Sequence, residues 1–133
     1  MQVPHELVLA GPVAEVMKTG AGAQTGGLQT SILAAGLAAS ALDYIEVEAC
    51  QRPELGAPAD ALRSEWKGLT DDLIGSLEGS RVCSHEAMRI RANSHVLRVT
   101  QAALAAAKGT GYVEGHAAGR WCREALFFLV WSC

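Results

Sequence analysis

Hydrophobic side chains recur at alternating steps of three and four residues along most of the chain beyond residue 27. This spacing places them on one face of an α-helix, because successive residues of a helix point about 100° apart. Pro53 ends the first predicted helix, Pro58 suits the first turn of the second, and Gly79 suits its C-cap. The pattern predicts four helices, over residues 28–51, 59–78, 85–108 and 118–131.

The same spacing assigns a buried face to each of the first three helices. In the first, this face consists of Ile32, Leu33, Gly36, Leu37, Ser40, Ala41, Tyr44 and Ile45. In the second it consists of Leu62, Trp66, Leu69, Leu73 and Leu77. In the third it consists of Met88, Ala92, His95, Val99, Ala102 and Ala106. Alanine and glycine are abundant, so we expect the helices to approach one another closely.

The chain before residue 28 lacks this spacing. Residues 1–27 begin with scattered aliphatic side chains and continue into a glycine-rich stretch, where a regular helix costs free energy. We therefore expect a short extended N-terminal lead-in over residues 1–27 and a helical domain over residues 28–133. The predicted fold class is all-α, a four-helix up-and-down bundle.

Composition and charge narrow the range of partners. Half of the 133 residues are hydrophobic and 19% are charged, with a net charge of −3 and no block of like charges. This balance supplies one core and favours neither nucleic acid nor an anionic membrane. No uninterrupted apolar run reaches the roughly 18 residues that a membrane span needs, and no secretory signal opens the chain. We expect a cytoplasmic protein with no nucleic-acid and no membrane partner.

The cysteines and histidines do not suggest a metal site. Cys50, Cys83, Cys122 and Cys133 are far apart and form no CxxC pair, so we expect free, mostly buried thiols in preference to disulfides. The histidines are equally scattered, and none pairs with an acidic residue at the helical spacing of metal ligands.

Three segments together resemble a known family. Residues 101–131, QAALAAAKGTGYVEGHAAGRWCREALFFLVW, combine an alanine-rich helix, a G-x-G-[YF] turn and an Arg-Glu-Ala helix. Residues 34–56, AAGLAASALDYIEVEACQRPELG, end in an Arg-x-x-apolar-Gly turn, and a Val-Pro pair with residues 7–11 precedes them. In this order the segments resemble the C-terminal helical domain of the FAD-dependent acyl-CoA dehydrogenases, although residues 59–78 match no motif of the family.

The resemblance implies a cofactor and candidate binding residues. Family members oxidise an acyl-CoA thioester between its α and β carbons, while a carboxylate removes one proton and the flavin accepts a hydride. By resemblance, Arg52 reaches the pyrophosphate of an FAD held by a neighbouring subunit, and Leu55 stands where a larger apolar side chain is common. The turn from Gly109 to Gly111 would bring backbone N–H groups to a phosphate or the adenosine edge. Two simpler interpretations stay open: Arg52 caps its own helix, and the turn is an ordinary C-cap relieved by glycine.

No catalytic residue follows from the resemblance. One position of the family glutamate aligns with Ser132, and the other aligns with Gly26 and Gly27, none of which can take up the α proton. The N-terminal and β-domains of the family are also absent. We therefore expect a C-terminal portion, or a short relative, of such a flavoprotein that is not an active enzyme alone.

The remaining charged and polar side chains have simple interpretations. His95 is expected to be a hydrogen-bonded core residue, and His116 to face solvent or to cap the last helix. An acidic face of the second helix is expected to be solvated: Glu65, Asp71, Asp72 and Glu78. A basic flank of the third helix could meet CoA phosphates, an acidic helix or, by default, water: Arg81, Arg89, Arg91 and Arg98.

Two further functions compete with the flavoprotein interpretation. The last helix is apolar almost all round from Phe127 to Trp131, so it needs cover from self-association or from docking to missing domains. A helical oligomerisation or interaction protein without cofactor would satisfy this need. A third possibility is a ligand-binding module with an apolar cavity between its alanine-faced helices, holding a fatty or aromatic molecule without nucleotide.

Overall fold

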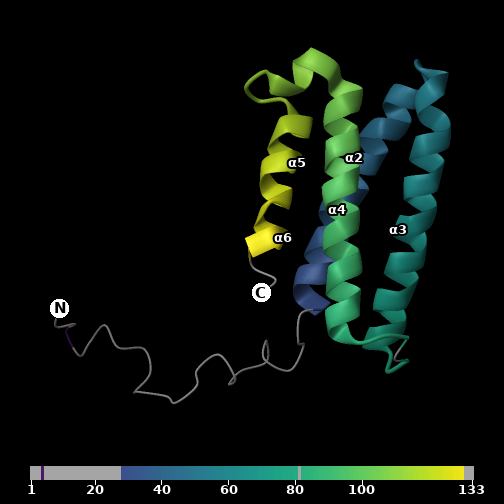
Figure 1. Ribbon diagram of the computed structural model, residues 1–133, viewed down its shortest axis with the longest axis vertical. Coiled ribbons are helices and arrows are strands. Elements are labelled where there is room, and N and C mark those ends of the chain that lie inside the picture. The colour runs from purple at the N-terminus through teal and green to yellow at the C-terminus, as the bar shows by residue number, and fades with distance from the viewer. Residues whose placement is uncertain (1–3, 5–27, 81, 131–133) are drawn as a thin grey trace.

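The computed structural model describes Pro4, residues 28–80 and residues 82–130, and within these residues all regular structure is helical. The predicted all-α four-helix bundle is confirmed (Figure 1). The predicted lead-in over residues 1–27 lies outside the described residues, apart from Pro4. The long helices are α2 (Leu28–Ala49), α3 (Gly56–Leu77) and α4 (His85–Ala107), followed by α5 (Ala117–Ala125) and α6 (Phe127–Val130).

Helices α2 and α4 form the centre of the bundle. Helix α3 lies on one side of this pair, and α5 with α6 lies on the other (Figure 1). Two short 3-10 helices make the connections at one end, η3 (Pro53–Leu55) between α2 and α3 and η4 (Lys108–Tyr112) between α4 and α5. Successive helices therefore run in opposite directions, as an up-and-down bundle requires.

The buried face of α2 differs from the predicted one. Ile32 is 44% exposed and Leu33 is 61% exposed, although both were expected in the core. The helix instead turns its small residues inward, and its buried positions are Leu28, Ser31, Ala34, Ala35, Ala38, Ala41, Leu42 and Ile45. Small side chains let the axes of α2 and α4 come close, and this contact outweighs the burial of two larger aliphatic residues at the margin.

The predicted faces of α3 and α4 are largely correct. In α4 the predicted residues are buried except Ala102, which packs partly buried against the core. In α3, Leu69 and Leu73 are buried and Leu62 and Trp66 are half-buried, but Leu77 is 60% exposed. Helix α3 thus packs against α2 and α4 through a narrow row of side chains.

The helix ends follow local signals in part. Gly79 has φ of 91°, and Ser80 N–H donates to Gly75 O at 2.8 Å, so the predicted glycine cap of α3 is confirmed. Helix α2 ends at Ala49, and Pro53 begins η3 instead of directly stopping α2. Ser84 caps α4, since its hydroxyl accepts from Ala87 N–H at 3.1 Å.

The last predicted helix is divided in two. Helix α5 ends at Ala125 and α6 begins at Phe127, with Leu126 between them. Leu129 N–H donates to Leu126 O, three residues back, so the turn tightens there. Only Phe128 of α6 is buried, and Asn93 Nδ2 donates to its carbonyl at 2.9 Å. Trp131, the predicted end, lies outside the described residues.

Ion pairs between α3 and α4 correct the expectation that the acidic face of α3 is solvated, and they agree with one of the alternatives left open for the basic flank of α4, an acidic helix. Arg91 Nη1 lies 2.6 Å from Asp72 Oδ2, and Arg98 Nη2 lies 2.5 Å from Glu65 Oε2. The basic flank of α4 therefore meets the acidic face of α3. Cross-helix pairs of this kind suit a partly exposed interface, where each contributes modestly.

The described cysteines are free, but they are less buried than expected. Cys50 is exposed, while Cys83 and Cys122 are half-buried, and Cys133 lies outside the described residues. Cys122 Sγ donates to Thr100 O at 3.1 Å, which links α5 to α4, and burial raises the pKa of this thiol.

One helix is long and apolar enough to cross a membrane by length and composition alone. This helix is α2, and 39% of its most apolar window is buried within the bundle. Asp43 still interrupts its apolar run, as expected from the sequence. Because the core helix of a bundle has the same composition, this single helix is weak evidence for a membrane span.

Candidate functional site

The residues singled out by the sequence gather at the bundle end where α2 and α4 finish. Arg52 follows α2 directly, and its Nη2 donates to Ala106 O in the last turn of α4 at 2.5 Å. The same nitrogen donates to Glu48 Oε2 at 2.5 Å, one helical turn back. Arg52 therefore binds the ends of two helices: its side chain caps the C-terminus of α4, and its backbone N–H donates to Glu48 O at 3.0 Å in the last turn of α2, as the simpler expectation required.

Gly109 and Gly111 lie three and five residues after Ala106 in the sequence. Gly109 is exposed, with open space around it, whereas Gly111 is buried. A Cβ on Gly111 would lie 2.6 Å from Leu104 Cδ1 and 3.1 Å from Ala107 Cβ. Gly111 thus packs closely against α4, where a side chain would displace Leu104, whereas Gly109 has room for one.

Helix α5 rests directly on this turn. A Cβ on Gly119 would lie 2.4 Å from Gly111 O, so two glycines let the backbone of α5 touch the backbone of η4. His116 Nδ1 accepts from Ala118 N–H at 3.2 Å and caps α5, as one of its two expected roles required. The corner from η4 to α5 is therefore fixed by close backbone packing and a side-chain cap.

The strained position of the turn is Lys108. This residue has φ of 52° and ψ of −143°, whereas neither Gly109 nor Gly111 has a positive φ. The expectation that glycine relieves the left-handed position after α4 is therefore wrong. A lysine in this conformation costs about 1–3 kcal/mol, and strain of this kind often marks functional backbone.

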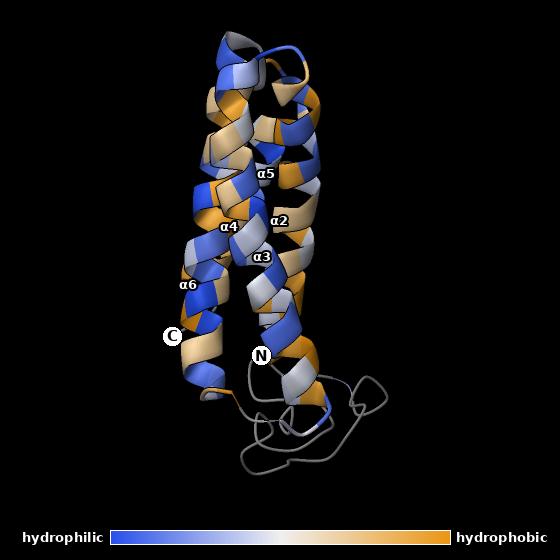
Figure 2. Cartoon of the chain, turned by 90° about the vertical axis from the view of Figure 1, so that its right-hand side faces the viewer, coloured by the Kyte–Doolittle hydropathy of each residue, from blue (hydrophilic) through white to orange (hydrophobic). Residues whose placement is uncertain are grey.

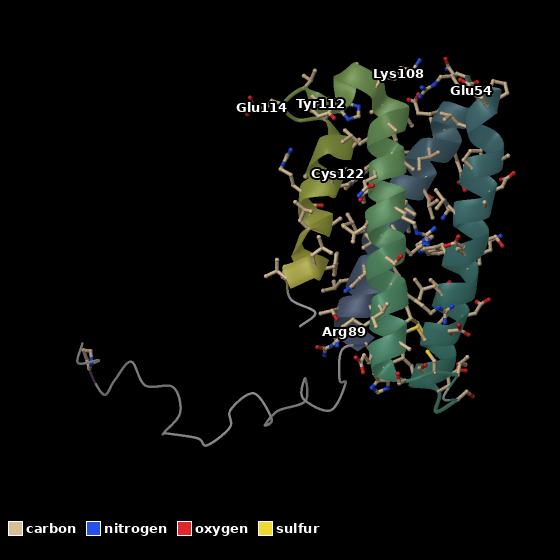
Figure 3. The ribbon with its side chains drawn as sticks, in the orientation of Figure 1. Glu54, Arg89, Lys108, Tyr112, Glu114 and Cys122 are labelled. Atoms are coloured by element: carbon tan, nitrogen blue, oxygen red, sulfur yellow. The ribbon has the colours of Figure 1, made fainter. Side chains whose placement is uncertain are left out.

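Lys108 and Tyr112 border a small hollow on the outside of the turn. The hollow measures about 280 Å³ and is lined by Gln101, Leu104, Ala105, Lys108 and Tyr112. Figure 3 shows Lys108 and Tyr112 at the same end of the bundle, and Tyr112 is 81% exposed. A flat apolar ring and an ammonium group are thus presented beside the turn.

Leu55 lies in η3 and is half-buried, and its N–H donates to Arg52 O at 3.0 Å. Beneath it, Tyr44 packs edge-on against the rings of His116 and Trp121, with centroids 5.8 and 5.9 Å away. Burial, followed by the neighbouring Glu48, raises the pKa of Tyr44. The ring contacts of Tyr44 join α2 to the start of α5.

The positive charges that could attract an anion at this end of the bundle are those of Arg52 and Lys108. A guanidinium carries five N–H donors in a planar fork. Both side-chain hydrogen bonds of Arg52 to described residues use Nη2, which leaves Nε and Nη1 for a phosphate. Glu48 opposes such an anion by its own charge, so a phosphate would compete with it for the guanidinium.

His95 lies elsewhere, between α3 and α4. Its predicted burial is confirmed, but its predicted hydrogen bond is not found. It is 3% exposed, as a core histidine should be, and burial lowers its pKa. Its Nδ1 lies 3.4 Å from Glu65 Oε2 without the alignment of a hydrogen bond, and neither ring nitrogen has a hydrogen-bond partner among the described residues. The imidazole is thus buried neutral.

Sequence reasoning missed four participants at the bundle end. Glu48 was visible as the residue four positions before Arg52, a spacing at which opposite charges meet on a helix. Gly119 was visible as a glycine inside a helical pattern, which indicates close backbone approach. Lys108 gave no signal of strain, and the carbonyl of Ala106 has no signature at all.

The positions that align with the family glutamate lie outside the described residues, namely Gly26, Gly27 and Ser132. Within the described part of the chain, no three His, Cys, Asp or Glu side chains gather as metal ligands would. No family model, curated protein or solved structure matches this chain.

Proposed function

We propose that this chain is the C-terminal helical portion, or a short relative, of an acyl-CoA dehydrogenase-like flavoprotein. In this proposal Arg52 and the turn from Gly109 to Gly111 lie against an FAD completed by another copy or another domain. The chain supplies cofactor contacts and no catalytic base. Oxidation of acyl-CoA then depends on residues outside it.

One observation carries the proposal: Arg52 and the glycine turn occupy the same end of the bundle. The hydrogen bond from Arg52 Nη2 to Ala106 O brings two segments together that are 54 residues apart in sequence. Had the fold placed them at opposite ends, a single cofactor could not reach both. Their proximity is what a shared diphosphate contact requires.

The remaining donors support the same chemistry. Gly109 is exposed, so its backbone is accessible, and Lys108 adds a second cation beside it. Phosphates are commonly held by a guanidinium fork together with backbone N–H groups. Leu55 and Tyr112 add apolar surface for the neighbouring part of a dinucleotide.

The test is the visible absorbance of the purified 133-residue chain after incubation with FAD and size-exclusion chromatography. We expect a flavin band that co-elutes with an oligomer, is lost in Arg52→Ala and is partly restored in Arg52→Lys. Arg91→Ala is the matched control, since Arg91 pairs with Asp72 at 2.6 Å outside this site. A folded oligomer that retains no flavin, or equal retention by Arg52→Ala, would refute the proposal.

A second candidate is a non-catalytic helical interaction protein that assembles through its last two helices. The observation that favours it is the exposure of large apolar side chains around α6. Leu126, Phe127, Leu129 and Val130 are 53%, 46%, 53% and 77% exposed. Such a patch favours a homo-oligomer or docking to another domain.

The two candidates separate in the same experiment. A colourless oligomer that Leu129→Glu and Val130→Glu dissociate would support assembly without a cofactor. Loss of flavin in Arg52→Ala with the oligomer intact would support the flavoprotein. The matched control is Val47→Glu, because Val47 is 66% exposed on α2, away from α6.

A further inference from the structure

A groove runs between α2 and α3, away from the Arg52 end of the bundle. It measures about 310 Å³, and its walls are almost wholly apolar. The main lining residues are Ile32, Gly36, Trp66, Leu73, Ile74 and Leu77. Figure 2 looks onto α3, with α2 on one side, where hydrophobic positions continue toward the N-terminal end of that helix.

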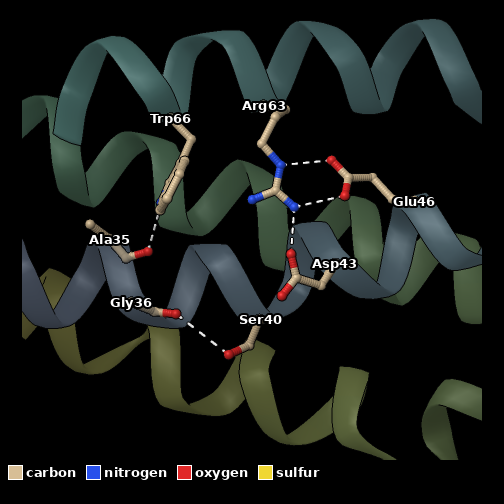
Figure 4. Close-up of polar contacts among 7 residues, drawn as sticks. All are labelled: Ala35, Gly36, Ser40, Asp43, Glu46, Arg63 and Trp66. Atoms are coloured by element: carbon tan, nitrogen blue, oxygen red, sulfur yellow. Dashed lines mark hydrogen bonds and ion pairs between the residues drawn. The ribbon is translucent and has the colours of Figure 1, made fainter. Parts of the chain in front are cut away.

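Trp66 forms a rigid wall at one end of the groove. Its Nε1 donates to Ala35 O at 2.8 Å, which fixes the indole against α2 (Figure 4). Behind it the Arg63 guanidinium lies 5.3 Å from the ring centroid and is itself held by Glu46 and Asp43, at 2.6 and 2.5 Å. The groove therefore closes at the Trp66 end.

The other end is open. Ile32 is 44% exposed and Leu77 is 60% exposed, and both flank the mouth of the groove. Gly36 forms part of the floor, and a Cβ placed on it would meet nothing within 4 Å. The absence of a side chain at this one position of α2 keeps the groove empty.

The lining offers an occupant no free side-chain donor and a single acceptor, Thr70 Oγ1. The Trp66 N–H is used by Ala35 O, and the Thr70 hydroxyl hydrogen is shared within α3 between Trp66 O and Lys67 O, at 3.0 and 2.9 Å. An extended peptide would bring several N–H and C=O groups, most of which find no partner here, at a large desolvation cost. A helix, about 10–12 Å across, would rest on the rim without filling the groove.

We propose that this groove binds a single unbranched aliphatic chain, the tail of a free amphiphile such as a fatty acid, with its end against Trp66. The chain has no hydrogen-bonding needs along its length, and each methylene that leaves water stabilises the complex. At the closed end Asp43 and Glu46 pair with Arg63, which leaves one net negative charge and no free cation for an anionic head group. The head group therefore emerges between Ile32 and Leu77.

Decanoate brominated at its terminal carbon tests the proposal, because bromine quenches an indole that it touches. We expect saturable quenching of tryptophan fluorescence in the full chain, and loss of that quenching in Trp66→Phe. Gly36→Leu, whose Cβ would meet nothing within 4 Å, places a side chain in the groove and should weaken binding about tenfold or more. The matched control is Gly68→Leu on α3, also exposed with open space but outside the groove, which should bind like the parent chain.

Three outcomes would overturn the proposal. The first is quenching that survives in Trp66→Phe or is unchanged in Gly36→Leu. The second is quenching only by vesicles of brominated phosphatidylcholine, which would assign the face to a membrane surface. The third is a dimer that Gly36→Leu dissociates while decanoate has no effect, which would assign the groove to a second copy. None of these variants changes a residue of the Arg52 site. Failure of the groove proposal would therefore leave the flavin proposal untouched, and failure of the flavin proposal would leave the groove proposal untouched.

Discussion

At the corner where α4 passes through η4 into α5, backbone touches backbone, whereas along the flank between α2 and α3 the helices leave a groove. Each region contains a glycine within a helix, Gly119 at the corner and Gly36 on the flank. At the corner a Cβ on Gly119 would meet Gly111 O at 2.4 Å, and on the flank a Cβ on Gly36 would meet nothing within 4 Å. The same residue type thus closes one interface and leaves the other open.

The comparison teaches that a glycine in a helix has no single structural meaning. Gly119 is required because no side chain fits between α5 and the turn. Gly36 is tolerated in spite of its cost to the helix, which is about 0.5–1 kcal/mol relative to alanine.

The largest expected effect is at the close-packed corner. Gly119→Ala should lower the free energy of unfolding by about 2–3 kcal/mol, because its Cβ would press on a carbonyl that cannot move alone. Chemical denaturation followed by circular dichroism measures this change. Gly75→Ala is the control, since its Cβ would lie 3.8 Å from Ser80 Cβ, an ordinary contact. If Gly119→Ala and Gly75→Ala lowered the free energy of unfolding equally, the corner would be no more closely packed than the end of α3.

The tie between α2 and α4 at the same end should matter next. Arg52→Ala should destabilise the bundle by about 1–2 kcal/mol, because the hydrogen bond to Ala106 O and the pair with Glu48 are both lost. The comparison variant is Arg91→Ala, whose more exposed pair with Asp72 should contribute only about 0.5 kcal/mol. Thermal unfolding of the two variants side by side gives the ranking, and a reversed order would contradict it.

A third variant tests whether the corner stores strain. Lys108→Gly should raise the free energy of unfolding by about 1 kcal/mol, because glycine adopts a φ of 52° without strain. Lys108→Ala removes the charge but keeps the strain, so it should give no such gain. If alanine stabilises as much as glycine, the charge and not the backbone is responsible.

The smallest expected effect is on the open flank. Gly36→Ala should stabilise the chain by about 0.5–1 kcal/mol, since the methyl group meets open space and the helix loses its most flexible residue. The same denaturation measurement detects the gain. A loss of stability would mean that the flank is closed in solution, which would argue against the groove.

The local structure of this chain was largely predictable, because it depends on neighbours in sequence. The three- and four-residue spacing located all the long helices to within a few residues, and Gly79 marked the end of α3. The break at Leu126 was not predictable, since the pattern of residues 118–131 continues through it. The carbonyl of Phe128 is held by Asn93 of α4, a contact from outside the segment.

The grouping of the candidate residues at one end of the bundle, and their contacts there, came only from the fold. The resemblance singled out Arg52, Leu55, Gly109 and Gly111, and the fold brings these to one end of the bundle. That Arg52 caps α4, that Gly111 is buried against Leu104 and that Lys108 carries the strain all depend on how α4 and α5 pack. A backbone carbonyl such as Ala106 O exists at every residue, so no sequence pattern distinguishes the one that is used.

The sequence by itself determined the helical class and the approximate bounds of α2, α3 and α4, because helix periodicity is a local property. Only the tertiary structure decided which face of α2 is buried, since a row of alanines allows closer packing than the larger Ile32 and Leu33. It also decided that Gly119 lies against the backbone of η4 and that Gly36 lies beside open space. The physical reason is that packing depends on atoms from distant segments, whose distances no local pattern contains.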